Sequence, residues 1–122
     1  MSESKKFKVF VYGSLKKGYW NSRLLTGQKF IGEAITKPVY NLYNLGAYPG
    51  LKISKNGKPY AVKGEVWEVT EQCLSRLDSL EGHPNFYKRQ NAELENFDGD
   101  VETYIYQGKV REENNIGSEW NG

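Results

Sequence analysis

One stretch of the chain carries the apolar spacing of an amphipathic helix, and this constrains the fold more than any other feature. The stretch runs from Glu71 to Leu80 and follows Thr70, a residue type that is favoured at a helix N-cap. Its apolar face comprises Cys73, Leu74, Leu77 and Leu80. The other ordered segments are about six or seven short runs of strand length that end at glycine, proline or asparagine. This pattern predicts a small α+β fold in which one helix packs against a closed or nearly closed sheet.

The length allows one domain. A chain of 122 residues buries one core but not two independent ones. Aromatic residues make up 14% of the chain, and their large rings compensate for a hydrophobic content of only 38%. We expect a domain over residues 7–110, a flexible N-terminus at 1–6, and a polar tail at 111–122. The tail is charged and rich in asparagine and glycine, so we expect it to be loose.

Charge and cysteine content exclude several classes of function. The 17 basic and 15 acidic residues nearly balance, and no dense basic run is present, so nucleic-acid binding is not expected. One cysteine and one histidine exclude an internal disulfide and disfavour a His/Cys metal site. The chain has no apolar window of signal-peptide or membrane-spanning character. We therefore expect a cytoplasmic protein without a membrane, a metal or a cofactor.

The first strand-like segment runs into a turn that can bind an anion. Val9 to Tyr12 is apolar and is followed by Gly13 and Ser14. A glycine there allows successive backbone N–H groups to point into one space, where they hold a carboxylate or a developing oxyanion. Ser14 also fits a nucleophile, but the only histidine, His83, has no acidic partner in a motif, which disfavours a Ser/His hydrolase. A plain turn without any site remains the alternative.

A carboxylate stands where the helical pattern ends. Glu81 precedes Gly82 and is flanked in sequence by Leu80, Phe86 and Tyr87. Apolar and aromatic neighbours desolvate a carboxylate and raise its pKa, which suits it to proton transfer. Taken alone, the segment indicates only a helix end that carries an acidic residue.

Together these two segments resemble known sequences. The motifs are VFVYGSLKKG at residues 9–18 and LDSLEG-x-P-x-x-Y-x-R at residues 77–89. They are similar to the gamma-glutamylcyclotransferase-like family, and closest to its small gamma-glutamylamine cyclotransferase branch. The similarity extends over roughly residues 7–107, in the family's order. It implies a small, mostly antiparallel β-barrel with an active cavity at its mouth.

The resemblance also implies roles for individual residues. Glu81 matches the family's acid/base glutamate, and the backbone N–H groups of Gly13, Ser14 and Leu15 would face the substrate. The substrate-binding residues that it implies are Tyr12, Gly13, Ser14, Leu15, Tyr87, Arg89 and Tyr106. For Arg89 the alternative is an ion pair that holds the loop, and for Tyr106 it is core packing.

Two neighbours of Glu81 are expected to have supporting roles. Asp78 would raise the pKa of Glu81 by like-charge repulsion or, as the alternative, act at the surface or as a helix cap. We expect His83 to be a solvated loop residue.

The implied reaction cleaves a gamma-glutamyl amide without water. The substrate's own α-amine attacks its γ-carbonyl, which gives 5-oxoproline and a free amine or amino acid, and no metal or cofactor is required. The alternative is a non-catalytic module that binds a small metabolite or a peptide in the same barrel. A nucleic-acid-binding barrel is a third interpretation, which the charge balance disfavours. The oligomeric state stays open, since the aromatic residues, Trp120 among them, permit a dimer without requiring one.

Overall fold

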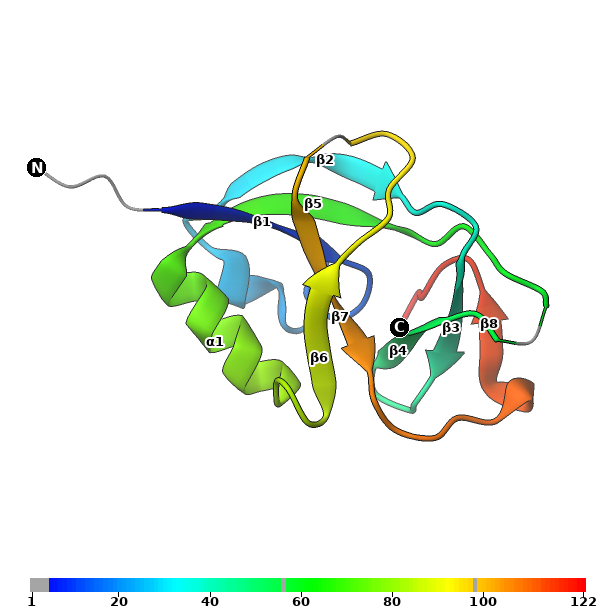
Figure 1. Ribbon diagram of the computed structural model, residues 1–122. Helices are drawn as coiled ribbons and strands as arrows, with labels where there is room; N and C mark the ends of the chain where they lie inside the picture. Colours follow the sequence, from blue (N-terminus) through cyan, green and yellow to red (C-terminus); the bar gives the residue numbers. More distant parts are fainter. Residues whose placement is uncertain (1–4, 56, 98) are drawn as a thin grey trace, which may run out of the picture.

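The structure is a computed structural model that describes residues 5–55, 57–97 and 99–122 (Figure 1). Its strands are β1 (Lys6–Val11), β2 (Lys29–Ile35), β3 (Tyr40–Asn44), β4 (Pro49–Ile53), β5 (Lys63–Thr70), β6 (Tyr87–Asn91), β7 (Val101–Tyr106) and β8 (Asn115–Gly117). Its helices are α1 (Glu71–Glu81) and the short 3-10 turns η1 (Ser22–Leu25) and η2 (Glu112–Asn114). No helix among these residues is long and apolar enough to cross a membrane. The hairpin turn that Asn56-Gly57 predicts includes Asn56, which lies outside the described residues.

The eight strands form one curled sheet, a half-barrel, in the order β2-β5-β1-β7-β4-β3-β8, with β6 paired to β7. Strand β7 lies parallel to β1 and to β4, and the other pairs are antiparallel. The α+β class, the mostly antiparallel sheet and the single main helix are therefore confirmed. The sheet has eight strands rather than about six or seven, and it is a half-barrel rather than a closed barrel.

Two clusters of buried side chains cover the two faces of the sheet. Phe10 on β1 joins the cluster that fills the curl, whereas its neighbour Val9 faces the cluster under α1, because side chains alternate along a strand. Helix α1 begins where the Thr70 hydroxyl accepts a hydrogen bond from the Cys73 N–H at 3.1 Å. It ends at Gly82, whose left-handed φ of 63° closes the last turn.

The expectation of a loose tail at 111–122 is wrong. Residues Asn115–Gly117 form β8, which pairs with β3, and Trp120 is only 3% exposed. The physical reason is that a long-range pairing partner and a buried ring order a segment whose local sequence is polar. At the other end, Lys6 already belongs to β1, so the predicted flexible segment 1–6 is too long; residues 1–4 lie outside the described residues.

Candidate active site

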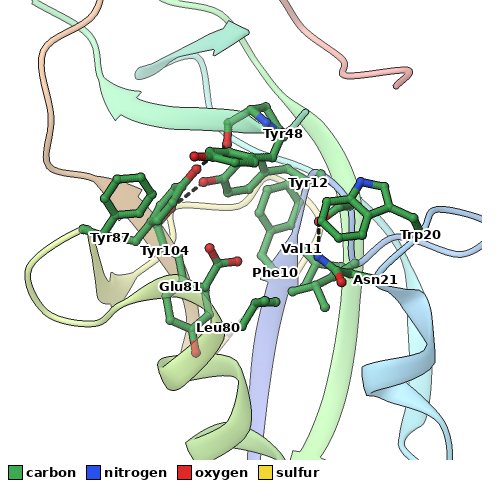
Figure 2. A pocket seen from close by; sticks show the side chains of 15 residues that line it. Phe10, Val11, Tyr12, Trp20, Asn21, Tyr48, Leu80, Glu81, Tyr87 and Tyr104 are labelled. Atoms are coloured by element: carbon green, nitrogen blue, oxygen red, sulfur yellow. Dashed lines mark hydrogen bonds between the residues drawn. The ribbon is translucent and has the colours of Figure 1, made fainter. Parts of the chain in front are cut away.

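A cavity of about 190 Å³ opens between the turn after β1 and the end of α1 (Figure 2). Its lining comes from five parts of the chain: the end of β1 with its turn, residues 20–21 before η1, residues 48–49 at the start of β4, the end of α1 with the following loop and the first residue of β6, and β7. The lining residues are Phe10, Val11, Tyr12, Gly13, Ser14, Leu15, Trp20, Asn21, Tyr48, Pro49, Leu80, Glu81, Phe86, Tyr87 and Tyr104. None of them is a lysine or an arginine.

The turn after β1 leaves backbone donors free. Asn21 fixes the turn, because its N–H donates to the Ser14 carbonyl at 2.9 Å and its side-chain amide donates to the Ser14 hydroxyl at 3.0 Å. The Lys16 N–H closes it on the Gly13 carbonyl at 3.0 Å. Among residues 5–55, 57–97 and 99–122, no acceptor is found for the N–H groups of Gly13, Ser14 and Leu15. These three donors remain available to a ligand in the cavity.

Gly13 is required by close packing. A Cβ at this position would lie 2.7 Å from both Cγ and Cδ of Pro49, the first residue of β4. The φ angle of Gly13 is not in the left-handed region, so its role is not conformational freedom. The glycine instead allows the turn to approach β4, and this approach forms one wall of the cavity.

Glu81 is the last residue of α1, and its side chain projects into the cavity toward Tyr12 and Tyr48 (Figure 2). Burial raises the pKa of the Glu81 carboxyl to about 7. The negative end of the helix dipole acts in the same direction. The carboxylate has no hydrogen-bond or ion-pair partner within the described part of the chain. Leu80, Phe86 and Tyr87 line the cavity beside it, as predicted for the residues that desolvate it.

A raised pKa makes Glu81 a source of pH-dependent instability. A carboxyl that binds its proton more tightly in the folded state favours folding below its unfolded pKa, and this contribution is lost as pH rises from about 4.5 through about 7. We therefore expect Glu81→Gln to stabilise the protein at pH 8, by up to about 3 kcal/mol, and to have little effect at pH 4. Urea unfolding of both proteins at the two pH values measures this. An equal effect at both pH values would contradict it.

Asp78 and Arg89 form a pair behind the cavity. Arg89 forms an ion pair with Asp78 through a short contact, and its Nε lies 3.2 Å from Oε1 of Glu102. Asp78 also accepts a hydrogen bond from the Tyr104 hydroxyl at 2.7 Å. The group fastens the end of α1 to β6 and β7. Arg89 is not among the residues that line the cavity, so the structure does not bring it to the predicted substrate site.

Tyr106 also lies outside the lining. Its ring packs against Phe86 and Tyr87, with ring centroids 5.5 and 5.3 Å away; the pair with Phe86 is T-shaped and the pair with Tyr87 is tilted. The packing alternative for Tyr106 therefore describes its observed surroundings. Aromatic contacts of this kind support the wall formed by Tyr87 from behind.

Two tyrosines that do line the cavity have their hydroxyls bound to the backbone. Tyr12 donates to the Tyr104 carbonyl at 2.7 Å and accepts from the Leu51 N–H at 3.2 Å. Tyr87 donates to the Pro49 carbonyl at 2.7 Å. Burial raises the pKa of both hydroxyls, so neither ionises near neutrality. Their rings form the cavity walls.

The sequence did not reveal every wall residue. Tyr104 lies two residues before Tyr106 in β7. Side chains alternate between the two faces of a sheet, so the sequence places both tyrosines on the same face. Asn21 directly precedes η1, a position where asparagine often caps a helix, but its side chain makes no cap bond and instead fixes the turn after β1. His83 is half-buried rather than solvated, because its Nδ1 accepts from the Arg89 N–H at 2.9 Å. Among residues 5–55, 57–97 and 99–122, no cluster of metal-ligating side chains is found.

Residues 9–121 match the family model described as gamma-glutamyl cyclotransferase, AIG2-like. The chain belongs to this family. A gamma-glutamylcyclotransferase-family relative from Methanocaldococcus jannaschii is 43% identical over 101 residues, which is 80% of this chain and 81% of that protein. The family protein YtfP of Escherichia coli is 35% identical over 103 residues, covering 84% of this chain and 85% of YtfP. A crystal structure of an AIG2-like protein from Mus musculus superposes with a TM-score of 0.74 at 28% identity, covering 88% of this chain and 81% of that one.

Membership of the family supports a cyclotransferase activity in general terms. The residues of both motifs that carried the resemblance fall within the matched range of the family model. Within the cavity, Glu81 and the turn at Gly13 come from these two motifs.

Proposed function

We propose that the protein cleaves a gamma-glutamyl amide by intramolecular aminolysis. The substrate's α-amine attacks the γ-carbonyl carbon, the bond to the amide nitrogen breaks, and the products are 5-oxoproline and a free amine or amino acid. Glu81 is the general acid and base of this proposal. The N–H groups of Gly13, Ser14 and Leu15 hold the α-carboxylate or the oxygen that becomes negatively charged in the transition state.

One observation carries the proposal. An unpartnered carboxylate with a raised pKa and a turn with three unused N–H donors line the same cavity of about 190 Å³. A cavity that only binds an apolar molecule has no need of either feature, and both are unfavourable for stability when no ligand is present.

The chemistry needs little more than these groups. Ring closure joins two atoms of one molecule, so much of the entropy loss is already met within the substrate. The α-ammonium must lose a proton, and the departing amine must gain one. A single carboxylate that lies near both nitrogens can take the proton and hand it on. No step of the proposal passes through a metal or a cofactor.

Burial of Glu81 matches it to this proton transfer. An α-ammonium has a pKa of about 7.7–8.0 and a solvated glutamate has one of about 4.3. Proton transfer from the ammonium to the carboxylate is therefore uphill by roughly 3.5 pKa units. With the pKa of Glu81 raised to about 7, the difference between the two pKa values falls to about one pKa unit. The desolvated position at the end of α1 therefore makes the carboxylate a much stronger base.

We expect kcat/KM to have a bell-shaped dependence on pH. Activity rises as Glu81 loses its proton near pH 7, and it falls again as the substrate ammonium loses its own near pH 8, because the proton that Glu81 transfers is then absent. Initial rates between about pH 5 and pH 9 measure the profile. An acid limb near pH 4, the value for a solvated glutamate, would contradict the assignment of Glu81 as the base.

The activity itself is tested with a panel of gamma-glutamyl amines and gamma-glutamyl amino acids, glutathione included. Mass spectrometry detects 5-oxoproline in each reaction. The exposed rim of Trp20, Leu80 and Phe86 carries no cation, so we expect uncharged apolar leaving groups to react best. If no member of the panel yields 5-oxoproline, the proposal is wrong. A thermal shift with these ligands and no turnover would instead favour the non-catalytic binding module.

A further inference from the structure

A buried lysine links the proposed substrate turn to the last segment of the chain. Lys16 follows the turn directly and is only 6% exposed. Its ammonium donates to the backbone carbonyl of Trp120 at 2.7 Å and lies 4.9 Å from the centre of the Tyr19 ring. The Tyr19 hydroxyl lies 3.5 Å from the same carbonyl oxygen, a longer contact than that of Lys16. The mechanism above makes no use of Lys16, so its burial requires another explanation.

The segment that accepts this hydrogen bond is itself anchored. Trp120 is 3% exposed, and its ring lies 5.4 Å from that of Tyr19, centre to centre. Two residues earlier, the Ser118 carbonyl accepts from the N–H of Lys63 at 2.7 Å, at the start of β5. Lys16 therefore binds a fixed point of the fold rather than a mobile end.

We propose that Lys16, through its hydrogen bond to Trp120, holds the turn of residues 13–15 in the geometry that binds the substrate. Lys16 is then a positioning residue for the reaction, and this inference rests on the proposed function. The turn is fixed on one side by Asn21 and on the other by the Lys16–Trp120 contact. The backbone of Lys16 also closes the turn on Gly13, so a shift of Lys16 moves the N–H donors with it.

Because the Lys16 ammonium is buried, it depends on its hydrogen bond to the Trp120 carbonyl. Burial lowers the pKa of Lys16, and the carboxylates of Glu119 and Glu65 oppose this shift. A buried ammonium without an acceptor is strongly unfavourable, so Lys16 either keeps its carbonyl partner or moves toward water. The second course would pull the turn away from the cavity.

The test compares four variants of the full chain. Lys16→Met removes the donor and keeps most of the apolar stem, whereas Lys16→Arg keeps a donor for the carbonyl. Trp120→Ala removes the ring that anchors the acceptor. Lys52→Met is a matched control, because the Lys52 ammonium also donates to a backbone carbonyl, that of Gly108, and lies near a tyrosine ring, but not at the cavity.

Two measurements are made on each variant. The first is amide hydrogen exchange at positions 16 and 21, whose N–H groups donate to the carbonyls of Gly13 and Ser14 and therefore report on the turn. The second is kcat/KM for the best gamma-glutamyl substrate. We expect Lys16→Met and Trp120→Ala to speed exchange and to lower kcat/KM by about tenfold. Lys16→Arg should recover most of the loss, and Lys52→Met should match the parent protein in both. Since Glu81 is not moved, the pH at which kcat/KM rises should stay the same in Lys16→Met.

The inference is overturned if Lys16→Met exchanges these amides at the parent rate, or if Lys52→Met has the same effect as Lys16→Met. Hydrogen exchange keeps this result separate from the proposed function. A parent protein that makes no 5-oxoproline contradicts the function, while faster exchange in Lys16→Met still supports the role of Lys16 in holding the turn.

Discussion

Replacing Glu81 with glutamine is expected to lower kcat/KM for 5-oxoproline formation by roughly 10²–10⁴-fold, the range for loss of a general acid–base group. Glutamine has nearly the same size as glutamate, so the cavity keeps its shape. Because its amide is uncharged, glutamine neither takes the proton of the α-ammonium nor returns one to the leaving amine. The measurement is steady-state kinetics by mass spectrometry at about pH 7.5.

Glu71→Gln is the control for this substitution. Glu71 is an exposed glutamate in the first turn of the same helix, away from the cavity. It changes the charge of α1 equally and should leave kcat/KM within about twofold of the parent value. If Glu81→Gln is as active as Glu71→Gln, the carboxylate at the end of the helix has no part in the reaction.

Gly13→Ala is expected to have the second largest effect, a decrease in kcat/KM of about 10²-fold, because a displacement near 1 Å in a positioned group has this consequence. The added Cβ would meet Pro49 at 2.7 Å, so the turn must move away from β4 and take its N–H donors with it. Overpacking of this kind also destabilises a fold, typically by about 1–3 kcal/mol. Kinetics and urea unfolding on the same preparation separate the two effects.

Gly32→Ala provides the matched glycine control. Gly32 lies in β2, its φ is not in the left-handed region, and an added Cβ would have its nearest neighbour, Cζ of Phe97, at an ordinary 3.7 Å. We expect its kinetics to match those of the parent protein. A Gly13→Ala variant that is folded and fully active would show that the close approach of the turn to Pro49 is not needed for activity.

Local patterns in the sequence predicted those parts of the molecule that local physics decides. The apolar repeat of 71–80, the Thr70 cap and the glycine that ends α1 are properties of neighbouring residues, and the structure contains all three. The same holds for the turn at Gly13 and for the desolvated surroundings of Glu81. These features gave the two main parts of the candidate site.

Pairing between distant residues decided the rest. Arg89 matched the family motif, but whether its guanidinium faces the cavity or Asp78 depends on how β6 lies against α1. Residues 115–117 became a strand only because β3 offers a partner, and Trp120 is buried only because Tyr19 and the core accept its ring. A polar, glycine-containing tail gives no local sign of either contact.

The hydrogen bonds of the Tyr12 hydroxyl bear on the order in which the parts of the chain fold. It connects the backbones of β7 and β4, whose mutual ladder contains a single residue pair, Leu51 with Ile105. The floor of the cavity is thus held by a contact between residues 92 positions apart in the chain. Closing so large a loop is slow, and it must precede any binding of substrate. We therefore expect the cavity to be among the last parts to form during folding, so that Tyr12→Phe slows the appearance of activity more than it slows the formation of α1.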